Sequence, residues 1–171
     1  MGVRCFVDTS AWFSLMIAGD RRHAQVRSAH AKLYRGGSLF VTSNLVLGEL
    51  YTLLSARTSA AGFWTFRDRV LASDRVRVLN LAPEQFDAAF LLLQRRKDKS
   101  YSFVDATSFA LMRDERIGTA LTLDRRFAQE GFTVTPTPEE LLHEPSRPHD
   151  ASTLASSPSS PRDVAKRPAG E

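Results

Sequence analysis

The chain has 171 residues, 43% of them hydrophobic, which is enough for one domain with a core but not for two domains of ordinary size. A net charge of +4 is compatible with a polyanionic partner such as a nucleic acid, and equally with a solvated basic surface. The single cysteine, Cys5, excludes an intramolecular disulfide, and no apolar run approaches the length of a membrane span. We therefore expect a cytoplasmic protein without a membrane segment, since the first residues also lack the features of a signal peptide.

Strand-like and helix-like segments alternate along the first part of the chain. In chain order, the pattern predicts a strand at 3–7, helices at 10–17 and 23–34, a strand at 39–42, helices at 45–54 and 59–72, a strand at 76–81, helices at 83–96 and 103–115, a strand at 119–123, a short helix at 125–129, a strand at 132–135 and a helical turn at 138–142. Asn44 and Ser102 are the predicted N-caps of two of these helices, and Pro83 opens a third. The alternation predicts an α/β fold with a mostly parallel central sheet and helices on both faces, which makes three layers.

The composition changes at about residue 144. From there on, Pro and Ser are interspersed and the periodicity ends, so the segment has too little apolar surface to offset its conformational entropy. We expect one domain over 1–143 and a disordered tail over 144–171. The basic residues of this tail are compatible with nucleic-acid contacts, although an inert tail is the simpler interpretation.

Two aspartates follow predicted strands. Asp8 comes after the strand at 3–7, and Asp124 after the strand at 119–123. In open parallel sheets, ligands bind beyond the carboxyl ends of the strands, so both carboxylates are candidates for a shared site. An Asp between a strand and a helix is also a common N-cap, and that alternative stays open at both positions.

Two further acids lie on predicted helices. Glu49 comes three residues after Val46 and four before Leu53, so it projects from the apolar face of its helix and needs a basic partner, a place at the edge of the core, or a metal. Asp105 follows Ser102 by three residues, which is a capping-box spacing, yet it shares a face with Phe109. Capping and a place in the site are compatible for Asp105.

Convergence of the four carboxylates would make them repel one another and raise some of their pKa values. Mg²⁺ or Mn²⁺ relieves such repulsion, because hard cations prefer carboxylate and water oxygens. A bound ion of this kind can activate water and stabilise the charge on a phosphate group, so the pattern predicts a metal-dependent nuclease that needs no His, Cys or Lys.

Four short motifs in this order resemble those of PIN domains. The first is Phe6-Val7-Asp8-Thr9-Ser10-Ala11-Trp12, and the second is Leu47-Gly48-Glu49-Leu50. The third is Ser102-Phe103-Val104-Asp105-Ala106-Thr107-Ser108-Phe109, and the fourth is Leu121-Thr122-Leu123-Asp124-Arg125-Arg126-Phe127. Each motif is weak alone, but the ordered set covers about residues 3–143 and is fairly specific.

The resemblance implies a PIN-like parallel sheet and metal-dependent ribonuclease activity. It assigns Asp8, Glu49, Asp105 and Asp124 as the catalytic, metal-binding acids, with Ser10 and Thr122 as supporting hydroxyls. Many small members are VapC-like toxins of type II toxin–antitoxin pairs, held inactive by an antitoxin and often homodimeric, so we expect an RNA substrate, a cognate antitoxin and a homodimer. The sequence departs from the pattern in its long Pro/Ser tail and in having Phe109 where some members have a further acid, which leaves one or two metal ions open.

Two surface features have competing interpretations. The first feature is a set of basic residues that either line a path for the RNA backbone or are ordinary solvated residues of helix ends and loops. These residues are Arg21, Arg22, Arg67, Arg69, Arg95, Arg96, Lys97 and Lys99. The aromatic segment at 63–66 fits extra core, and less often a groove for a dimer partner or an antitoxin.

A PIN-fold RNA-binding or scaffold protein without catalysis is the main alternative function, and loss of one of the four acids would favour it. A third hypothesis makes Asp8 a phosphotransfer nucleophile, as in haloacid-dehalogenase-like hydrolases. Those enzymes need a second Asp two residues later, where this chain has Ser10, so we discard it.

Overall fold

A five-stranded sheet forms the centre of the computed structural model, which describes residues 2–57, 61–96 and 98–142. The strands are β1 (Arg4–Val7), β2 (Leu39–Ser43), β3 (Val76–Leu79), β4 (Thr119–Leu121) and β5 (Thr133–Thr135). They lie in the order β3-β2-β1-β4-β5, and each of the pairings between neighbours is parallel. The predicted parallel α/β fold is confirmed, and β1 and β4 are central neighbours.

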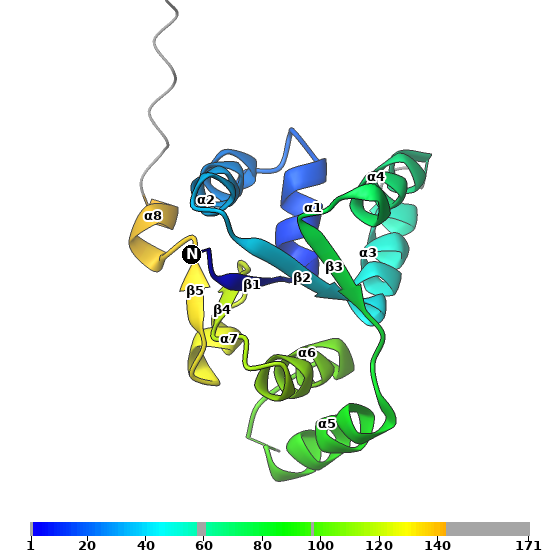
Figure 1. Cartoon of the computed structure of the whole chain (residues 1–171). Helices are drawn as coiled ribbons and strands as arrows, with labels where there is room; N and C mark the ends of the chain where they lie inside the picture. The colour runs from blue at the N-terminus through cyan, green and yellow to red at the C-terminus, as the bar shows by residue number, and fades with distance from the viewer. Residues whose placement is uncertain (1, 58–60, 97, 143–171) are drawn as a thin grey trace, which may run out of the picture.

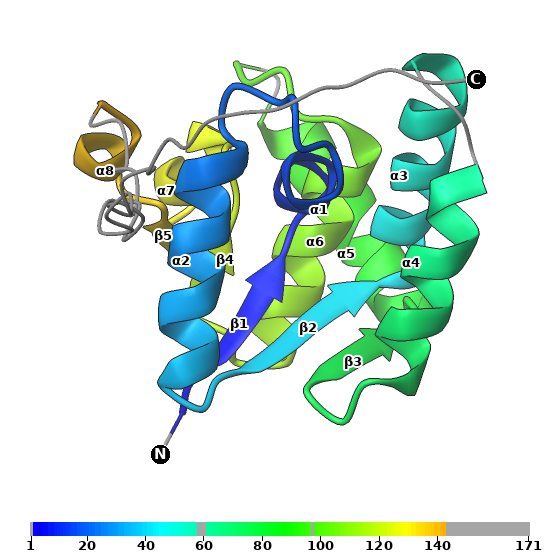
Figure 2. The same cartoon turned by 90° about the horizontal axis from the view of Figure 1, so that it is seen from above.

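Helices cover both faces of this sheet. They are α1 (Thr9–Met16), α2 (His23–Arg35), α3 (Asn44–Arg57), α4 (Ala61–Ala72), α5 (Pro83–Arg95), α6 (Phe103–Asp114), α7 (Arg125–Gln129) and α8 (Pro138–Leu142). Figures 1 and 2 show α1, α2 and α4 on one side of the sheet and α6 and α7 on the other, with α5 packed on the outer side of α6. The three-layer arrangement is therefore as predicted. Within the described ranges, no helix has the length and hydrophobicity needed to span a bilayer.

The burial of β1 on both faces explains why its sequence is an uninterrupted apolar run. Cys5, Phe6 and Val7 are fully buried, because helices cover the strand from both sides. Phe127 of α7 packs against Phe6 at 6.3 Å between ring centroids and against Phe109 of α6 at 4.8 Å. Burial raises the pKa of the Cys5 thiol to about 12, which agrees with a core residue rather than a reactive thiol.

Two of the predicted strand ends are wrong. The strand predicted to end at 123 ends at Leu121, because the hydroxyl groups of Thr122 and Ser10 accept the backbone N–H groups of Asp124 and Leu123. The strand predicted at 76–81 ends at Leu79.

The predicted N-cap Asn44 is also wrong. The Ser43 hydroxyl accepts the Val46 N–H, while the Asn44 side chain accepts the N–H of Leu81 from the segment after β3. The predicted tail at 144–171 lies outside the described residues.

Candidate functional site

Asp8 stands at the carboxyl end of β1, directly beside the end of β4. Val7 pairs with Leu121, and the Asp8 N–H donates to the Leu121 carbonyl at 3.1 Å. The Asp8 side chain caps α1 by accepting the Ser10 N–H at 3.3 Å. Its Oδ2 also accepts the hydroxyl of Ser10 at 2.7 Å and that of Thr122 at 3.0 Å. The N-cap alternative is therefore correct for Asp8, and the same carboxylate still lies at the expected edge.

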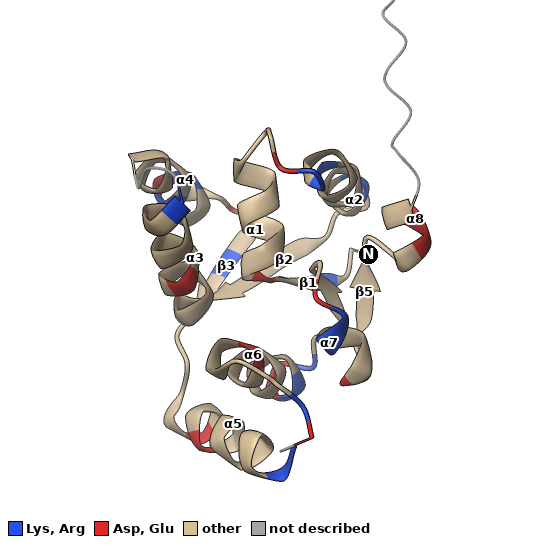
Figure 3. Ribbon diagram, turned by 180° about the vertical axis from the view of Figure 1, so that it is seen from behind, with Lys and Arg blue, Asp and Glu red and all other residues tan. Residues whose placement is uncertain are grey.

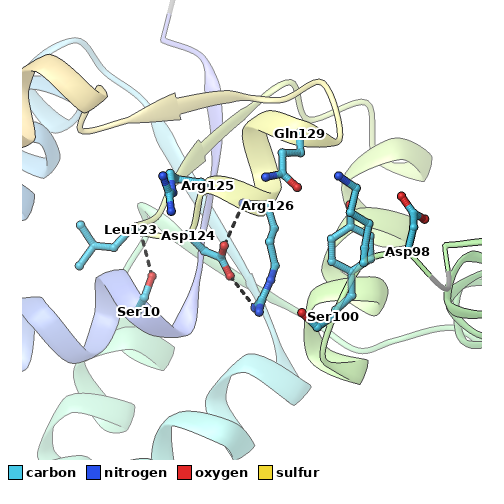
Figure 4. Close-up of a pocket in the computed structure, with 10 residues that line it drawn as sticks. Ser10, Asp98, Ser100, Leu123, Asp124, Arg125, Arg126 and Gln129 are labelled. Carbon is cyan, nitrogen blue, oxygen red and sulfur yellow. Dashed lines mark hydrogen bonds and ion pairs between the residues drawn. The ribbon is translucent and has the colours of Figure 1, made fainter.

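Ser10 and Thr122 connect Asp8 to the turn that carries Asp124. The Thr122 hydroxyl donates to Asp8 and accepts the Asp124 N–H at 2.9 Å. The Ser10 hydroxyl donates to Asp8 and accepts the Leu123 N–H at 3.0 Å, an interaction drawn in Figure 4. Each hydroxyl thus uses its donor and its acceptor on opposite sides of the site. The two hydroxyls hold the Asp8 carboxylate and the Asp124 backbone in a fixed relation.

Asp8 is buried, and no cationic side chain of residues 2–57, 61–96 and 98–142 pairs with it. The side chain is 6% exposed. Desolvation raises the pKa of Asp8 to about 6, although the hydrogen bonds from Ser10 and Thr122 oppose that shift. An ionised carboxylate in this place costs folding free energy unless a cation accompanies it.

Glu49 reaches the same edge from α3. It is half-buried, and its Oε2 accepts the hydroxyl of Thr9, the residue after Asp8, at 2.5 Å. Its partner is therefore a hydroxyl, and within the described part of the chain no Lys or Arg forms an ion pair with it. Of the explanations considered for Glu49, a basic partner is wrong, while a place at the core edge and a role toward a cation both remain.

Asp105 forms the predicted capping box and lies at the site as well. Its N–H donates to the Ser102 hydroxyl at 3.0 Å, and its Oδ2 accepts the Ser102 N–H at 2.7 Å. Burial raises the pKa of Asp105, and the negative charge of Asp124 adds to that shift. Asp105 and Asp124 are therefore close enough to repel each other.

Arg126 lies between these two acids. Its Nη1 is 3.2 Å from Asp105 Oδ2 and 3.1 Å from Asp124 Oδ2. Asp124 also caps α7, since its Oδ1 accepts the Arg126 N–H at 2.8 Å. Figure 4 shows the Arg126 side chain extending away from α7, with its guanidinium end beside the Asp124 carboxylate. The guanidinium supplies the positive charge that this pair of acids requires.

The four predicted acids are gathered at one edge but do not form a ready-made ion cage. Figure 3 shows acidic segments where β1 joins α1, on α3 and on α6, with the basic α7 beside them. In the ranges that the structure describes, no three His, Cys, Asp or Glu side chains are grouped closely enough to hold an ion as they stand. The donor set nevertheless fits a hard divalent cation. All four residues are carboxylates, Asp8 and Glu49 have no cationic partner among the residues described, and Arg126 occupies a position where positive charge is needed.

A hollow of about 600 Å³ opens beside Asp124, on the side of the α5–α6 connection (Figure 4). We call it the polar hollow; its walls are Ser10, Asp98, Lys99, Ser100, Tyr101, Leu123, Asp124, Arg125, Arg126 and Gln129. Lys99, one of the basic residues for which an RNA path and a solvated loop were both open, lines this hollow, whereas Lys97 is outside the described residues. Arg67 and Arg96 are instead paired with Asp68 and Glu130.

Glu130 fixes one wall of the polar hollow. Its side chain is only 3% exposed, and its Oε1 accepts from Arg96 and from the Tyr101 hydroxyl, both at 2.6 Å. Its Oε2 pairs with Arg113 of α6, also at 2.6 Å. Despite the opposing effect of burial, these donors lower the pKa of Glu130. Glu130 thereby ties both ends of the α5–α6 connection to the end of α7.

Replacing Glu130 with Gln should destabilise the protein by about 1–2 kcal/mol, because the hydrogen bonds from Arg96, Tyr101 and Arg113 lose the charge of their acceptor while the exposed arginines remain solvated. Since folding lowers this pKa, the contribution is present above pH 4.5 and is lost as the pH falls through the folded value. Urea titration at pH 7 and at lower pH measures both effects. The exposed Glu84→Gln is the control, and equal losses in the two variants would contradict this role of Glu130.

Three of the residues that shape the site were missed by the sequence prediction: Thr9, Arg126 and Glu130. Thr9 and Arg126 lie inside the quoted motifs, next to Asp8 and two residues after Asp124, but nothing in their spacing indicates a contact with another acid. Glu130 is an acid after a five-residue helix, and only the tertiary structure brings Arg96 and Arg113 to it.

The parallel sheet, with acids at the carboxyl ends of its two central strands, defines a class of α/β proteins in which this edge is the site. A model of the PIN domain matches residues 5–132, and the chain belongs to the PIN domain family. It is 39% identical over 127 residues to the 23S rRNA-specific endonuclease VapC20 of Mycobacterium tuberculosis, covering 74% of this chain and 94% of that protein.

Solved structures show the same likeness. The crystal structure of M. tuberculosis VapC20, described as a toxin that cleaves the sarcin–ricin loop, has a TM-score of 0.69 at 37% identity, covering 75% of this chain and 96% of that one. VapBC2 of Rickettsia felis, solved with a DNA fragment from its promoter, has a TM-score of 0.58 at 14% identity, covering 77% and 97% of the two chains. The second likeness concerns the fold alone.

Proposed function

We propose that this protein is a Mg²⁺- or Mn²⁺-dependent endoribonuclease in which Asp8, Glu49, Asp105 and Asp124 hold the ion and Ser10 and Thr122 support the site. The observation that carries the proposal is Asp8, a buried carboxylate at the edge of a PIN-family sheet that has no cationic partner in the part of the chain that the structure describes. Neutral residues would serve the fold better at this place, so its charge indicates a function.

The bound ion, the hydroxyl groups and the basic side chains have different roles in the proposed reaction. A bound divalent ion supplies Lewis acidity, which lowers the pKa of water and neutralises charge on the phosphate. Ser10 and Thr122 keep Asp8 oriented through hydrogen bonds of 2.7 and 3.0 Å, and Thr9 does the same for Glu49. Lys99 and Arg126 line the polar hollow, where they can hold phosphate oxygens of the RNA.

The substrate that we propose is ribosomal RNA. The support is the 39% identity to a 23S rRNA-specific endonuclease that matches over 94% of its length. The test incubates the purified protein with bacterial ribosomes and with an unrelated RNA, with Mg²⁺, with Mn²⁺ or with EDTA. Primer extension across the sarcin–ricin loop of 23S rRNA should give a metal-dependent stop. Binding of RNA without any cleavage would favour the non-catalytic alternative instead.

We also propose that the protein is the toxin of a type II pair and forms a homodimer. Exposed rings fit such partners: Trp64 is 53% exposed and packs against Tyr51, which is 38% exposed, over the buried Phe63. Phe63 belongs to the core and Phe66 is partly buried against it, so the interpretation as additional core holds for these two residues but not for Trp64. Light scattering should give a dimer mass for the protein alone and a larger complex after co-expression with a small upstream reading frame.

A further inference from the structure

A second groove adjoins Asp124 on the side away from the α5–α6 connection. It has a volume of about 580 Å³, within the range of small-ligand sites, and it shares Leu123, Asp124 and Arg125 with the polar hollow. Asp124 therefore stands on a ridge between two hollows. A strand bound across this acid must place the nucleotides before and after it on the two sides of the ridge.

The second groove, which we call the mixed groove, combines an apolar wall with a basic rim. Val134 and Pro136 at the end of β5 and Leu142 of α8 contribute to the wall, and Arg21, Arg22 and Arg125 to the rim. The polar hollow has no comparable apolar wall among the residues that line it. The two sides of the ridge therefore offer different chemistry to a bound strand.

Neighbouring groups hold the basic rim in place but do not neutralise the charges of its arginines. Arg22 donates through Nη1 to the Leu141 carbonyl, which fixes α8 against the loop before α2. Asp20 also lines the groove, but its carboxylate is engaged by the Ser14 hydroxyl and the Arg22 N–H, both at 2.8 Å. The side chains of Arg21 and Arg125 are exposed and, within the described part of the chain, form no ion pair.

We infer that the mixed groove binds the nucleotide adjoining the bond that is cut, with its base against Val134, Pro136 and Leu142 and its phosphate on Arg21 and Arg125. This inference rests on the proposed function. A nucleotide has the same two parts as the groove, because its base presents apolar faces and its phosphate is an anion that Arg binds with two donors. The phosphate contacts position the strand, and the apolar wall selects the base at one flanking position.

The test uses a labelled single-stranded RNA of mixed sequence with Arg21→Gln, Leu142→Ser and the control Arg35→Gln. Arg35 ends α2 at the opposite edge of the sheet, is exposed, and loses the same charge. Fluorescence anisotropy at several salt concentrations gives affinity and its salt dependence. Arg21→Gln should weaken binding by about 5-fold and reduce the slope of log affinity against log salt by about 0.7, the value expected for one phosphate contact of a single strand.

Leu142→Ser should weaken binding by about 3-fold without changing that slope, since it removes apolar contact and no charge. Sequencing the products of a randomised RNA should show a changed base preference at a single position beside the cut. Unchanged affinity for both variants, or an equal loss in Arg35→Gln, overturns the inference. If the wild-type protein binds through this groove but cuts no RNA, the subsite stands and the proposed nuclease function fails.

Discussion

Replacing Asp8 with Asn should abolish RNA cleavage and at the same time stabilise the metal-free protein. The loss of activity should be at least about 100-fold, because even outer partners of metal ligands cost 10–100-fold when removed. The gain in stability follows from burial, since Asn keeps the cap of α1 and the acceptor oxygen without a desolvated charge. Because the ionised Asp8 side chain lowers the stability of the protein, we infer that it serves function rather than folding.

The size and pH dependence of this gain follow from the pKa of Asp8. Folding raises that pKa from 3.8 to about 6, so the ionised side chain opposes folding by about 3 kcal/mol at pH 8. This contribution of about 3 kcal/mol to the stability of the wild type is fully present below pH 3.8 and is lost as the pH rises through about 6, so the advantage of Asp8→Asn disappears below pH 3.8. Metal binding and cleavage should rise over the same interval around pH 6, because the ion requires the carboxylate.

Urea titrations in EDTA at pH 8 and pH 4 measure the difference, with the exposed Asp74→Asn as the control. Excess Mn²⁺ should then stabilise the wild type more than the variant, since only the wild type retains its full set of ligands. A variant that is less stable than the wild type at pH 8 in EDTA would show that Asp8 serves the fold.

Replacing Arg126 with Gln should increase the affinity for Mn²⁺ by about 10-fold. The guanidinium lies 3.1–3.2 Å from oxygens of Asp105 and Asp124, so a divalent ion has to displace it from this pair. Without Arg126 the two acids repel each other, which lowers the stability of the metal-free protein and strengthens their attraction for a cation. Cleavage should nevertheless fall, because Arg126 also faces the polar hollow where RNA phosphates are proposed to bind.

Calorimetric titration with Mn²⁺ in the absence of RNA is the appropriate measurement, and Arg125→Gln is its matched control. Arg125 is the preceding residue and carries the same charge, but in the structure it forms no ion pair with a described acid. An equal gain in affinity for both variants would reflect net charge alone. A loss of affinity in Arg126→Gln would mean that Arg126 arranges the acids rather than competing with the ion.

The fold was predictable from the sequence because its signals are local. The buried run at 5–7 and the helical spacing around Glu49 and Phe109 depend on side chains of the same segment, and the parallel topology follows from their alternation. Strand ends were predicted less well, as at Leu121, because they depend on hydroxyl groups that arrive from another segment.

The candidate site was only partly predictable for the same reason. The sequence places Asp8 and Asp124 after two strands, which brings them to the same edge only if those strands are neighbours, and the structure shows that β1 and β4 are neighbours. Their detailed partners depend on tertiary contacts between segments more than 100 residues apart, such as the bond from Thr122 to Asp8. The pairing of Asp105 and Asp124 through Arg126 has no periodic signal at all, and neither has the burial of Glu130.

The most direct measurement is the anomalous scattering of manganese in a crystal of the full chain soaked with Mn²⁺. We predict a peak at the carboxyl ends of β1 and β4, coordinated by Asp8 together with Asp105 and Asp124 and approached by Glu49, with the Arg126 guanidinium moved away from the acid pair. An RNA-cleaving protein whose crystals show Arg126 still between the two acids and manganese bound elsewhere would contradict the account.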